Sequence, residues 1–226
     1  MQRFAVALET GPKGRMLAQA LEWIGWCRAG KDEAKALNQL VTAGLRYAQV
    51  AQRAGLIFVT PSSIEAFEIV ELIPGTATTD FGAPGVPLTS DLEPLTEEEI
   101  ERYLDLLTAC WATFDDDLHC IPADLRDLKP ERGRSPSAVR LHLLETERMH
   151  LSAFGPAFRH PDAAHVAEQE AVVREQLLAE LRTVPRKEVL IPRRRYGFAW
   201  TSRFAVRRSA WHAPDHAWEL LERLGR

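Results

Sequence analysis

The sequence predicts an α+β protein in which a small N-terminal α/β unit precedes a C-terminal four-helix bundle. Residues 1–75 mix short β-rich runs with one amphipathic segment. Residues 76–94 are rich in Gly, Pro, Thr and Asp and lack a helical period, which indicates a connector. Residues 95–226 contain four long segments with helix-capping signals, enough for a bundle with a shared core. We therefore expect two units, 1–75 and 95–226, joined by 76–94.

The strands of the N-terminal unit are predicted from short apolar runs. "RFAVALE" at 3–9 suits a strand, whereas "MLAQALEW" at 16–23 fits a strand or a helix, because short apolar runs are ambiguous. "LIFVT" at 56–60 and "AFEIVELI" at 66–73 are rich in β-formers, and the second alternates. Residues 31–55 have apolar side chains at helical spacing, with Gly55 as the expected cap. The apolar positions of this helix are Ala34, Leu37, Leu40, Val41, Leu45 and Ala48.

Capping signals define the four helices of the bundle. Thr96 and Glu99 form a capping box before "EEEIERYLDLLTACWATF". Ser135 and Pro136 supply an N-cap and a first-turn proline for "SAVRLHLLETERMHLSAF", which we expect Gly155 to end. The other signals are His160, Pro161 and Asp162 at the start of the third helix, and Thr201 or Ser202 and Gly225 at the two ends of the fourth.

The bulk composition is that of a soluble globular protein. The chain has 226 residues, 46% hydrophobic and 27% charged, and no apolar stretch approaches the ~18 residues of a membrane span. Three cysteines without a secretory leader indicate free thiols and a cytoplasmic location. No P-loop, G-x-G-x-x-G or G-x-S-x-G motif is present, so nucleotide-binding and serine-hydrolase classes lack support.

The stretch "WHAPDHAWELL" places His212 and His216 four residues apart near the end of the last expected helix. Residues at this spacing share one helix face, and two neutral imidazoles there can bind one divalent metal. A catalytic site of this type needs a third ligand from another helix and an open position. His142 is the best-placed candidate, since it lies beside the apolar stripe of the second helix. The alternative is that these are ordinary core or surface histidines, and Pro214 would bend the helix between the pair.

The last and second expected helices resemble those of the DinB/YfiT-like four-helix proteins. "RRSAWHAPDHAWELLERL" is similar to their "WHxxDHxWE" segment, and "RSPSAVRLHLLETERMH" to their "H-x-x-E-x-E" segment. The resemblance covers about residues 93–226. It implies an up-down four-helix bundle and a three-histidine metal site formed by His142, His212 and His216. Members include thiol-dependent transferases and isomerases and hydrolases, so the cofactors implied are a divalent metal, Zn or Ni, and a low-molecular-weight thiol.

The N-terminal part resembles HicB-like domains. Those have a small antiparallel sheet, a "PGxxxxGxxxxEA" turn and a following helix, and "WIGWCRAGKDEAKAL" occupies that position here. Trp23 and Ile24 replace the usual proline entry. The resemblance favours a strand for "MLAQALEW" and does not by itself imply nucleic-acid binding.

Basic and aromatic residues are interleaved between 186 and 208. This pattern suits nucleic acid, a small anionic substrate or a solvated loop with salt bridges. The net charge of −4 argues against general DNA binding, although 160–226 carries a net +3 (12 basic, 9 acidic). We expect Arg195, Arg203 and Arg207 to bind an anionic group.

The resulting hypothesis is a divalent-metal-dependent enzyme whose three-histidine site activates water or a thiol for hydrolysis or thiol-dependent transfer. Glu145 is the expected general base, and Asp215 is expected to orient an imidazole. The partners predicted are a small-molecule substrate, no membrane and, for the chain itself, a homodimer. The alternative hypothesis is a non-catalytic bundle, with a structural metal or none, that acts as a binding protein.

Overall fold

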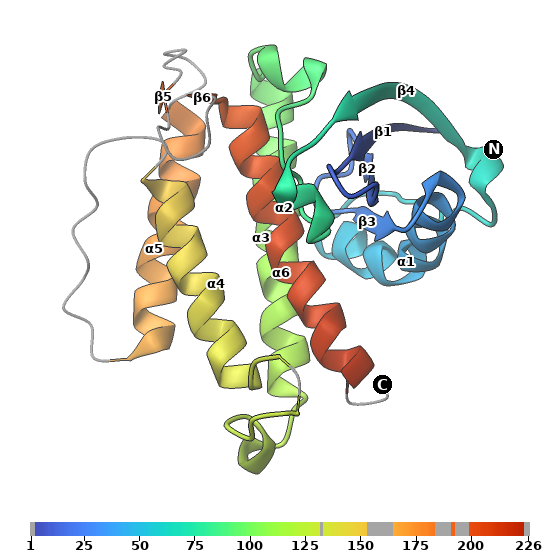
Figure 1. The fold of residues 1–226 in the computed structure, drawn as a ribbon. Helices are drawn as coiled ribbons and strands as arrows, with labels where there is room; N and C mark the ends of the chain where they lie inside the picture. Colours follow the sequence, from blue (N-terminus) through green and yellow to red (C-terminus); the bar gives the residue numbers. More distant parts are fainter. Residues whose placement is uncertain (1–2, 132, 153–164, 184–190, 193–198, 224–226) are drawn as a thin grey trace.

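The computed structural model describes residues 3–131, 133–152, 165–183, 191–192 and 199–223. A four-stranded sheet with one long helix lies beside four long helices (Figure 1). The α+β class and the helical bundle are confirmed. None of the helices in the described part of the chain combines the length and hydropathy of a membrane span.

The sheet has the strand order β3-β2-β1-β4. Its strands are β1 (Phe4–Thr10), β2 (Met16–Ala20), β3 (Cys27–Gly30) and β4 (Phe67–Pro74). The first three pair antiparallel, and β4 joins β1 in parallel with a register shift between Val6 and Ala7. "MLAQALEW" thus contains a strand. The register places Val6 opposite Ala20 and Ala7 opposite Gln19, so adjacent residues face opposite sides of the sheet.

Helix α1 (Glu33–Arg53) covers one face of the sheet and also contacts α3. Its N-cap is Asp32, and Gly55 follows its end with a φ of +70°, as the sequence predicts. The core beneath α1 is aromatic: Trp26 stacks on Tyr47, and Phe58 packs edge-on to both.

The strand predicted at 56–60 is wrong, because this segment is irregular. In this segment Leu56 and Phe58 pack against the core, while Ile57 and Val59 are exposed. The edge of β1 that β2 leaves free pairs with β4, and 56–60 pairs with no strand of the sheet.

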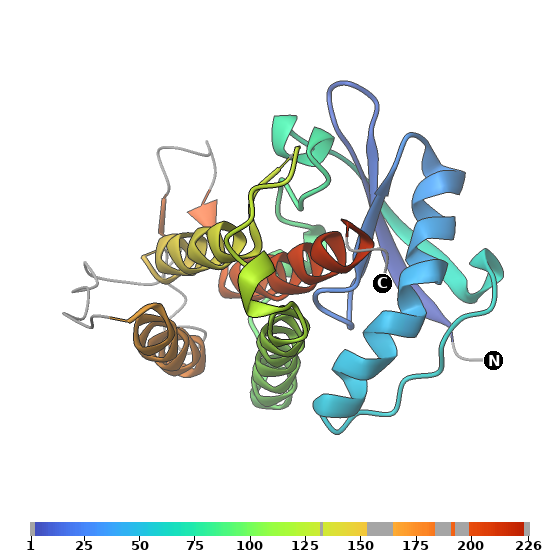
Figure 2. The same ribbon diagram turned by 90° about the horizontal axis from the view of Figure 1, so that it is seen from below.

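The bundle consists of α3 (Glu97–His119), α4 (Pro136–Leu151), α5 (Val166–Thr183) and α6 (Ser202–Arg223). Seen end-on in Figure 2, α6 lies between α3 and α4, and α5 closes the other side. The colours of Figure 1 show that α4 and α5 run in the same direction, so the implied up-down order is wrong. The sequence between the two helices permits this: 14 residues separate them, and a chain of that length can span the ~27 Å of an 18-residue helix, so the helices need not be antiparallel.

The capping signals agree with the helix starts. Thr96 and Glu99 form a reciprocal capping box at α3, and the Ser135 hydroxyl accepts a hydrogen bond from the N–H of Ala138 at the start of α4. The Thr201 hydroxyl accepts from the N–H of Phe204, so Thr201 caps α6. Helix α4 ends at Leu151, and the expected signals at Gly155, 160–162 and Gly225 lie outside the described residues.

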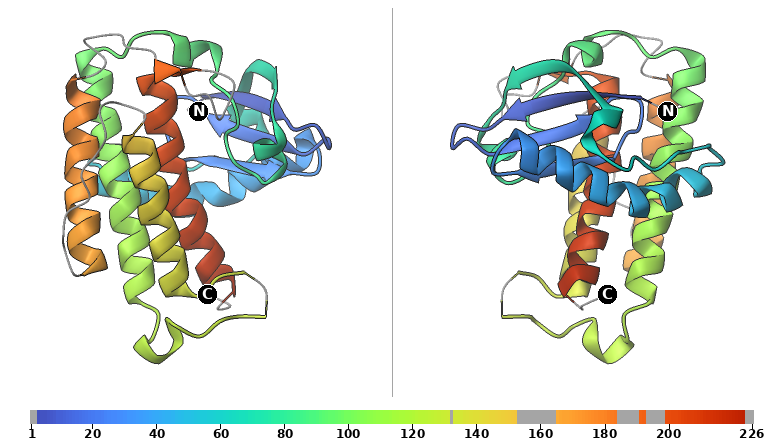
Figure 3. Two further views of the ribbon diagram at one scale, coloured as in Figure 1. Left: turned by 60° about the vertical axis from the view of Figure 1, so that its left-hand side comes forward. Right: turned by 90° about the vertical axis from the view of Figure 1, so that its right-hand side faces the viewer.

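The second face of the sheet packs on α6 and on the connector, which contains helix α2 (Ala77–Asp80) and the 3₁₀ turn η2 (Thr89–Leu92). Leu17 and Cys27 meet Ala83 and Trp211 there. We call the sheet β1–β4 with helix α1 the sheet unit. Figure 3 shows α6 between this sheet unit and the rest of the bundle. One face of α6 therefore packs on the sheet unit, and the other packs on α3 and α4. None of the three cysteines forms a disulfide, in agreement with the prediction.

The smaller elements are the 3₁₀ turns η1 (Ile64–Ala66) and η3 (Ala123–Leu125) and the two-stranded sheet of β5 (Ile191–Pro192) and β6 (Ala199–Trp200).

Candidate metal centre

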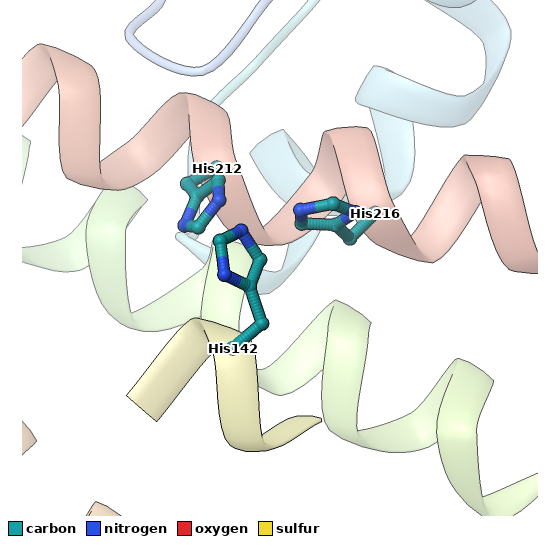
Figure 4. Close-up of side chains that lie close together, drawn as sticks. All are labelled: His142, His212 and His216. Carbon is teal, nitrogen blue, oxygen red and sulfur yellow. The ribbon is translucent and has the colours of Figure 1, made fainter. Parts of the chain in front are cut away.

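Three histidines meet where α4 crosses α6. His142 projects from α4, and His212 and His216 project toward it from successive turns of α6 (Figure 4). The ring centroids lie 4.8 Å apart for His212 and His216, 5.0 Å for His142 and His212, and 5.2 Å for His142 and His216. Each residue offers a ring nitrogen, and these three nitrogens lie within 4.8 Å of one another. The structure thus brings together the three histidines singled out in the sequence.

Pro214 lies in the interior of α6, between the two histidines. With about 100° of rotation per residue, it points to the opposite side of the helix from the imidazoles. Proline has no N–H, so the carbonyl of Ala210, four residues earlier, lacks its usual helical donor. The helix continues to Arg223 nevertheless, and the histidine pair keeps its spacing of one turn.

The electrostatic setting keeps two of the rings neutral. Burial lowers the pKa of His212 well below its ordinary value, and the neighbouring His216, His150 and His142 act in the same direction. Burial also lowers the pKa of His142, with Arg134 and His216 adding to the effect. Metal ions bind neutral imidazole, so these shifts leave both rings in the ligand form near neutral pH.

One polar atom of the cluster is left without a protein partner. The Nδ1 atom of His212 is buried and forms no hydrogen bond, and the whole residue is only 7% exposed. A buried polar atom without a partner is costly, and a bound ion or water is a common explanation. Three imidazoles are also a donor set that suits Zn²⁺ and Ni²⁺. The residues present therefore fit a divalent metal.

Glu219 is the carboxylate that holds a ring of the cluster. The His216 Nδ1 atom lies 2.9 Å from Glu219 Oε2, and this contact leaves Nε2 for a ligand. Asp215 was expected to orient an imidazole, but its Oδ1 atom accepts a hydrogen bond from Arg28 of β3 at 2.7 Å. The reason is the placement of the sheet unit, which presents Arg28 to the far side of α6.

Besides His142, three titratable groups of α4 bear on the site: two carboxyl groups and one imidazole. Glu145, the expected general base, is exposed one turn after His142. Glu147 is buried, and burial raises its pKa to about 7, with Arg174 opposing the shift. His150 is also buried, and its Nδ1 lies 2.8 Å from the hydroxyl of Ser209 on α6. From the sequence, Glu147 is expected to point away from His142, and His150 is a weaker ligand candidate near the helix end; their burial was not predicted, although they continue the spacing of Val139 along α4.

The arginines expected to bind an anion have carboxylate partners within the chain. Arg203 bonds Glu99 at 2.7 and 2.9 Å and lowers the pKa of that carboxyl to about 2. Arg207 is buried and is paired with Asp91. These two side chains join α6 to α3 and to the connector and do not face the histidines. Arg195 lies outside the described residues.

No family model and no curated protein matches this sequence. Among solved structures, the chain is similar to YfiT from Bacillus subtilis, described as "a probable metal-dependent hydrolase with an unusual four-helix bundle topology". The identity is 16% and the TM-score 0.45, and the match covers 65% of this chain and 96% of YfiT.

Proposed function

We propose that this chain is a divalent-metal-dependent enzyme that acts on a small molecule by hydrolysis or by thiol-dependent transfer. The observation that carries the proposal is the cluster of His142, His212 and His216, in which one buried nitrogen has no protein partner. Three protein ligands are typical of catalytic zinc sites, whereas structural zinc sites have four. Both His142 and His216 are partly exposed, so the cluster is open on one side.

The chain's own residues have distinct roles in this proposal. The three imidazoles would hold the ion, and Glu219 orients one of them through the Nδ1 of His216. A bound Zn²⁺ or Ni²⁺ supplies Lewis acidity that lowers the pKa of a bound water or thiol. Glu145 is the carboxylate proposed to accept the proton, because it is exposed and one turn from His142.

The first test is the metal content of the full chain. Metal-free protein titrated with Zn²⁺ in a calorimeter is expected to bind one ion, and the variants His142→Ala and His212→Ala are expected to lose this binding. His119→Ala is the matched control, since His119 is exposed and its Nδ1 contacts the carbonyl of Asp115 in its own helix. Equal zinc binding by all four proteins would refute the proposal.

The second test asks whether the ion keeps an open position. Co²⁺ replaces Zn²⁺ and reports its ligands by visible absorption, and a small thiol such as 2-mercaptoethanol serves as the probe. A new thiolate-to-cobalt charge-transfer band in the wild type indicates an open site. An unchanged spectrum favours the alternative function, a bundle with a closed, structural metal that serves as a binding protein.

The HicB-like identity of the N-terminal unit is also a proposal. Three antiparallel strands followed by a helix support it, as in β1 to α1. This likeness assigns no activity to the unit.

A further inference from the structure

The sheet unit carries a hollow of about 490 Å³ at the corner formed by the β1–β2 turn, the end of β3 and the start of α1. Figure 2 shows this turn and the start of α1 at the same end of the unit. None of the three clustered histidines lines the hollow. Its volume lies in the range of about 300–1,000 Å³ that is typical of small-molecule sites.

Four cationic side chains from three segments line this hollow. Lys13 and Arg15 come from the β1–β2 turn, Lys31 follows β3, and Lys35 lies in the first turn of α1. No carboxylate is among the lining residues. Like charges gathered around one hollow repel one another, and an anion placed between them removes that repulsion.

Two carboxylates that contact the lining segments accept hydrogen bonds from the backbone of those segments. Asp32 accepts a hydrogen bond from the N–H of Lys35 at 2.8 Å and lies 3.9 Å from the Lys31 ammonium. Asp80 accepts from the N–H of Lys13 at 3.1 and 3.2 Å. Within the described part of the chain, the side chains of Lys13, Arg15 and Lys35 form no ion pair. Their charges therefore remain available to a ligand.

The charge pattern indicates a small ligand and not an extended nucleic acid. A second hollow of about 240 Å³ shares Arg15, Ala29 and Gln39 with the first and continues along α6, where acidic side chains line it. A phosphate backbone that left the cationic hollow in this direction would meet Glu219 and Glu222, whereas Asp215 is paired with Arg28 in the same hollow. The net charge of the chain, −4, likewise disfavours the binding of an extended nucleic acid.

We propose that the hollow lined by Lys13, Arg15, Lys31 and Lys35 binds the phosphate groups of a small phosphorylated molecule. Three ammonium groups and one guanidinium match a phosphate or diphosphate better than a single carboxylate, which needs only one cation. The remainder of the ligand lies along the shared groove toward Glu219, the residue that contacts His216. Placing the ligand near His216 makes it the substrate, and this part rests on the proposed function. The binding of the phosphate groups in the cationic hollow does not depend on that function.

The test uses the full chain freed of metal with a chelator, so that the probe is not bound by an ion. Sodium pyrophosphate is titrated into the protein in a calorimeter at fixed ionic strength. We expect saturable binding at one site, weakened about tenfold by Arg15→Gln or by Lys35→Gln, because each removes one charge-assisted contact. Lys129→Gln makes the same charge change at an exposed site elsewhere and is expected to leave binding unchanged. Circular dichroism of each variant checks the fold.

Three outcomes would overturn this proposal. They are no saturable binding at millimolar pyrophosphate, equal weakening in Lys129→Gln, and a random single-stranded oligonucleotide that binds more tightly and displaces pyrophosphate. The double variant His142→Ala, His216→Ala separates the two proposals, and we expect it to bind pyrophosphate as the wild type does. A wild type that binds pyrophosphate but not zinc retains the anion site and refutes only the metal-dependent function.

Discussion

The Nδ1 atom of His216 contacts the carboxylate of Glu219. A carboxylate in this position fixes the ring and makes the other nitrogen a better ligand. Glu219→Gln is therefore expected to weaken zinc binding roughly 10–100-fold. Competition with a chromophoric chelator measures the affinity. Glu222→Gln is the control, since Glu222 lies one turn on and pairs with Arg46. Equal affinities in the two variants would show that the contact has no effect on the metal.

Glu147 gives the protein a pH-dependent stability. Its pKa in the folded state is about 7, raised from 4.5 mainly by burial. The folded state therefore holds this proton more tightly than the unfolded chain. Stability from this group is fully present below pH 4.5 and is lost as the pH rises to about 7, by roughly 2–3 kcal/mol.

Glu147→Gln removes that dependence, because glutamine does not titrate. Urea unfolding at several values between pH 5 and 8 is expected to show a smaller loss of stability with rising pH in the variant. His142 and His212 have lowered pKa values, so their contribution to stability changes with pH in the opposite direction, but it is the same in both proteins. Glu145→Gln, at an exposed position on the same helix, should follow the wild type. Parallel curves for Glu147→Gln and wild type would contradict the assignment.

Spacing within one helix predicted part of the candidate centre, and contacts between distant segments account for the rest. His212 and His216 follow from their separation of four residues, and His142 from its position beside an apolar stripe. Glu147 and His150 could have been found in the same way, because Val139, Leu143, Glu147 and His150 recur at intervals of four, four and three residues. The pairing of Asp215 with Arg28 joins residues far apart in the chain, so no local pattern could indicate it.

At the scale of elements, the sequence predicted where helices begin better than it predicted how strands pair and in which direction helices run. Caps such as Thr96 and Ser135 are local hydrogen bonds, so they can be predicted from neighbouring residues. Both 56–60 and 66–73 are rich in β-formers, and only the second pairs with β1, so strand pairing could not be read from local composition. The parallel course of α4 and α5 likewise depends on how the whole bundle packs.

The β2–β3 turn of the sheet unit closely approaches the α6 carbonyl that the proline leaves without a donor. Pro214 leaves the carbonyl of Ala210 without a helical donor, and a Cβ built on Gly25 would lie 2.8 Å from that oxygen. Gly25 also has a φ of +89°. Glycine is thus required for both the turn and the contact between the β2–β3 turn and α6.

Gly25→Ala is expected to destabilise the protein by more than the ~1–2 kcal/mol of a left-handed alanine, because the clash with Ala210 adds to it. Gly55→Ala isolates the backbone cost, since Gly55 has a φ of +70° with nothing within 4 Å of a built Cβ. Urea unfolding of both variants measures the difference. A smaller loss for Gly25→Ala than for Gly55→Ala would contradict the role given to this contact.

At the scale of the whole molecule, a buried polar network joins three parts of the chain. Arg207 of α6 bonds Asp91 of η2 and Gln19 of β2, and Gln19 donates to Glu9 of β1 at 3.0 Å. Glu9 also accepts from the N–H of Gly85 in the connector at 2.9 Å. Burial raises the pKa of Glu9, and the hydrogen bonds around it oppose the shift. The residues predicted to be a connector therefore form part of the packed interface, and their division from the two units stays a prediction.

Asp91→Ala tests how strongly this network holds the sheet unit to the bundle. Asp91 is 1% exposed and Arg207 4%, so the variant leaves a buried guanidinium without its carboxylate. Loss of one partner of a buried pair costs about 3–5 kcal/mol, and we expect a decrease of that size in the free energy of unfolding. The double variant Asp91→Ala, Arg207→Met removes the orphaned charge and is expected to recover most of the loss, while Asp124→Ala, at an exposed site, should change little. Urea unfolding followed by tryptophan fluorescence and by circular dichroism measures all three. A double variant no more stable than Asp91→Ala alone would mean that the cost comes from the cavity and not from the charge.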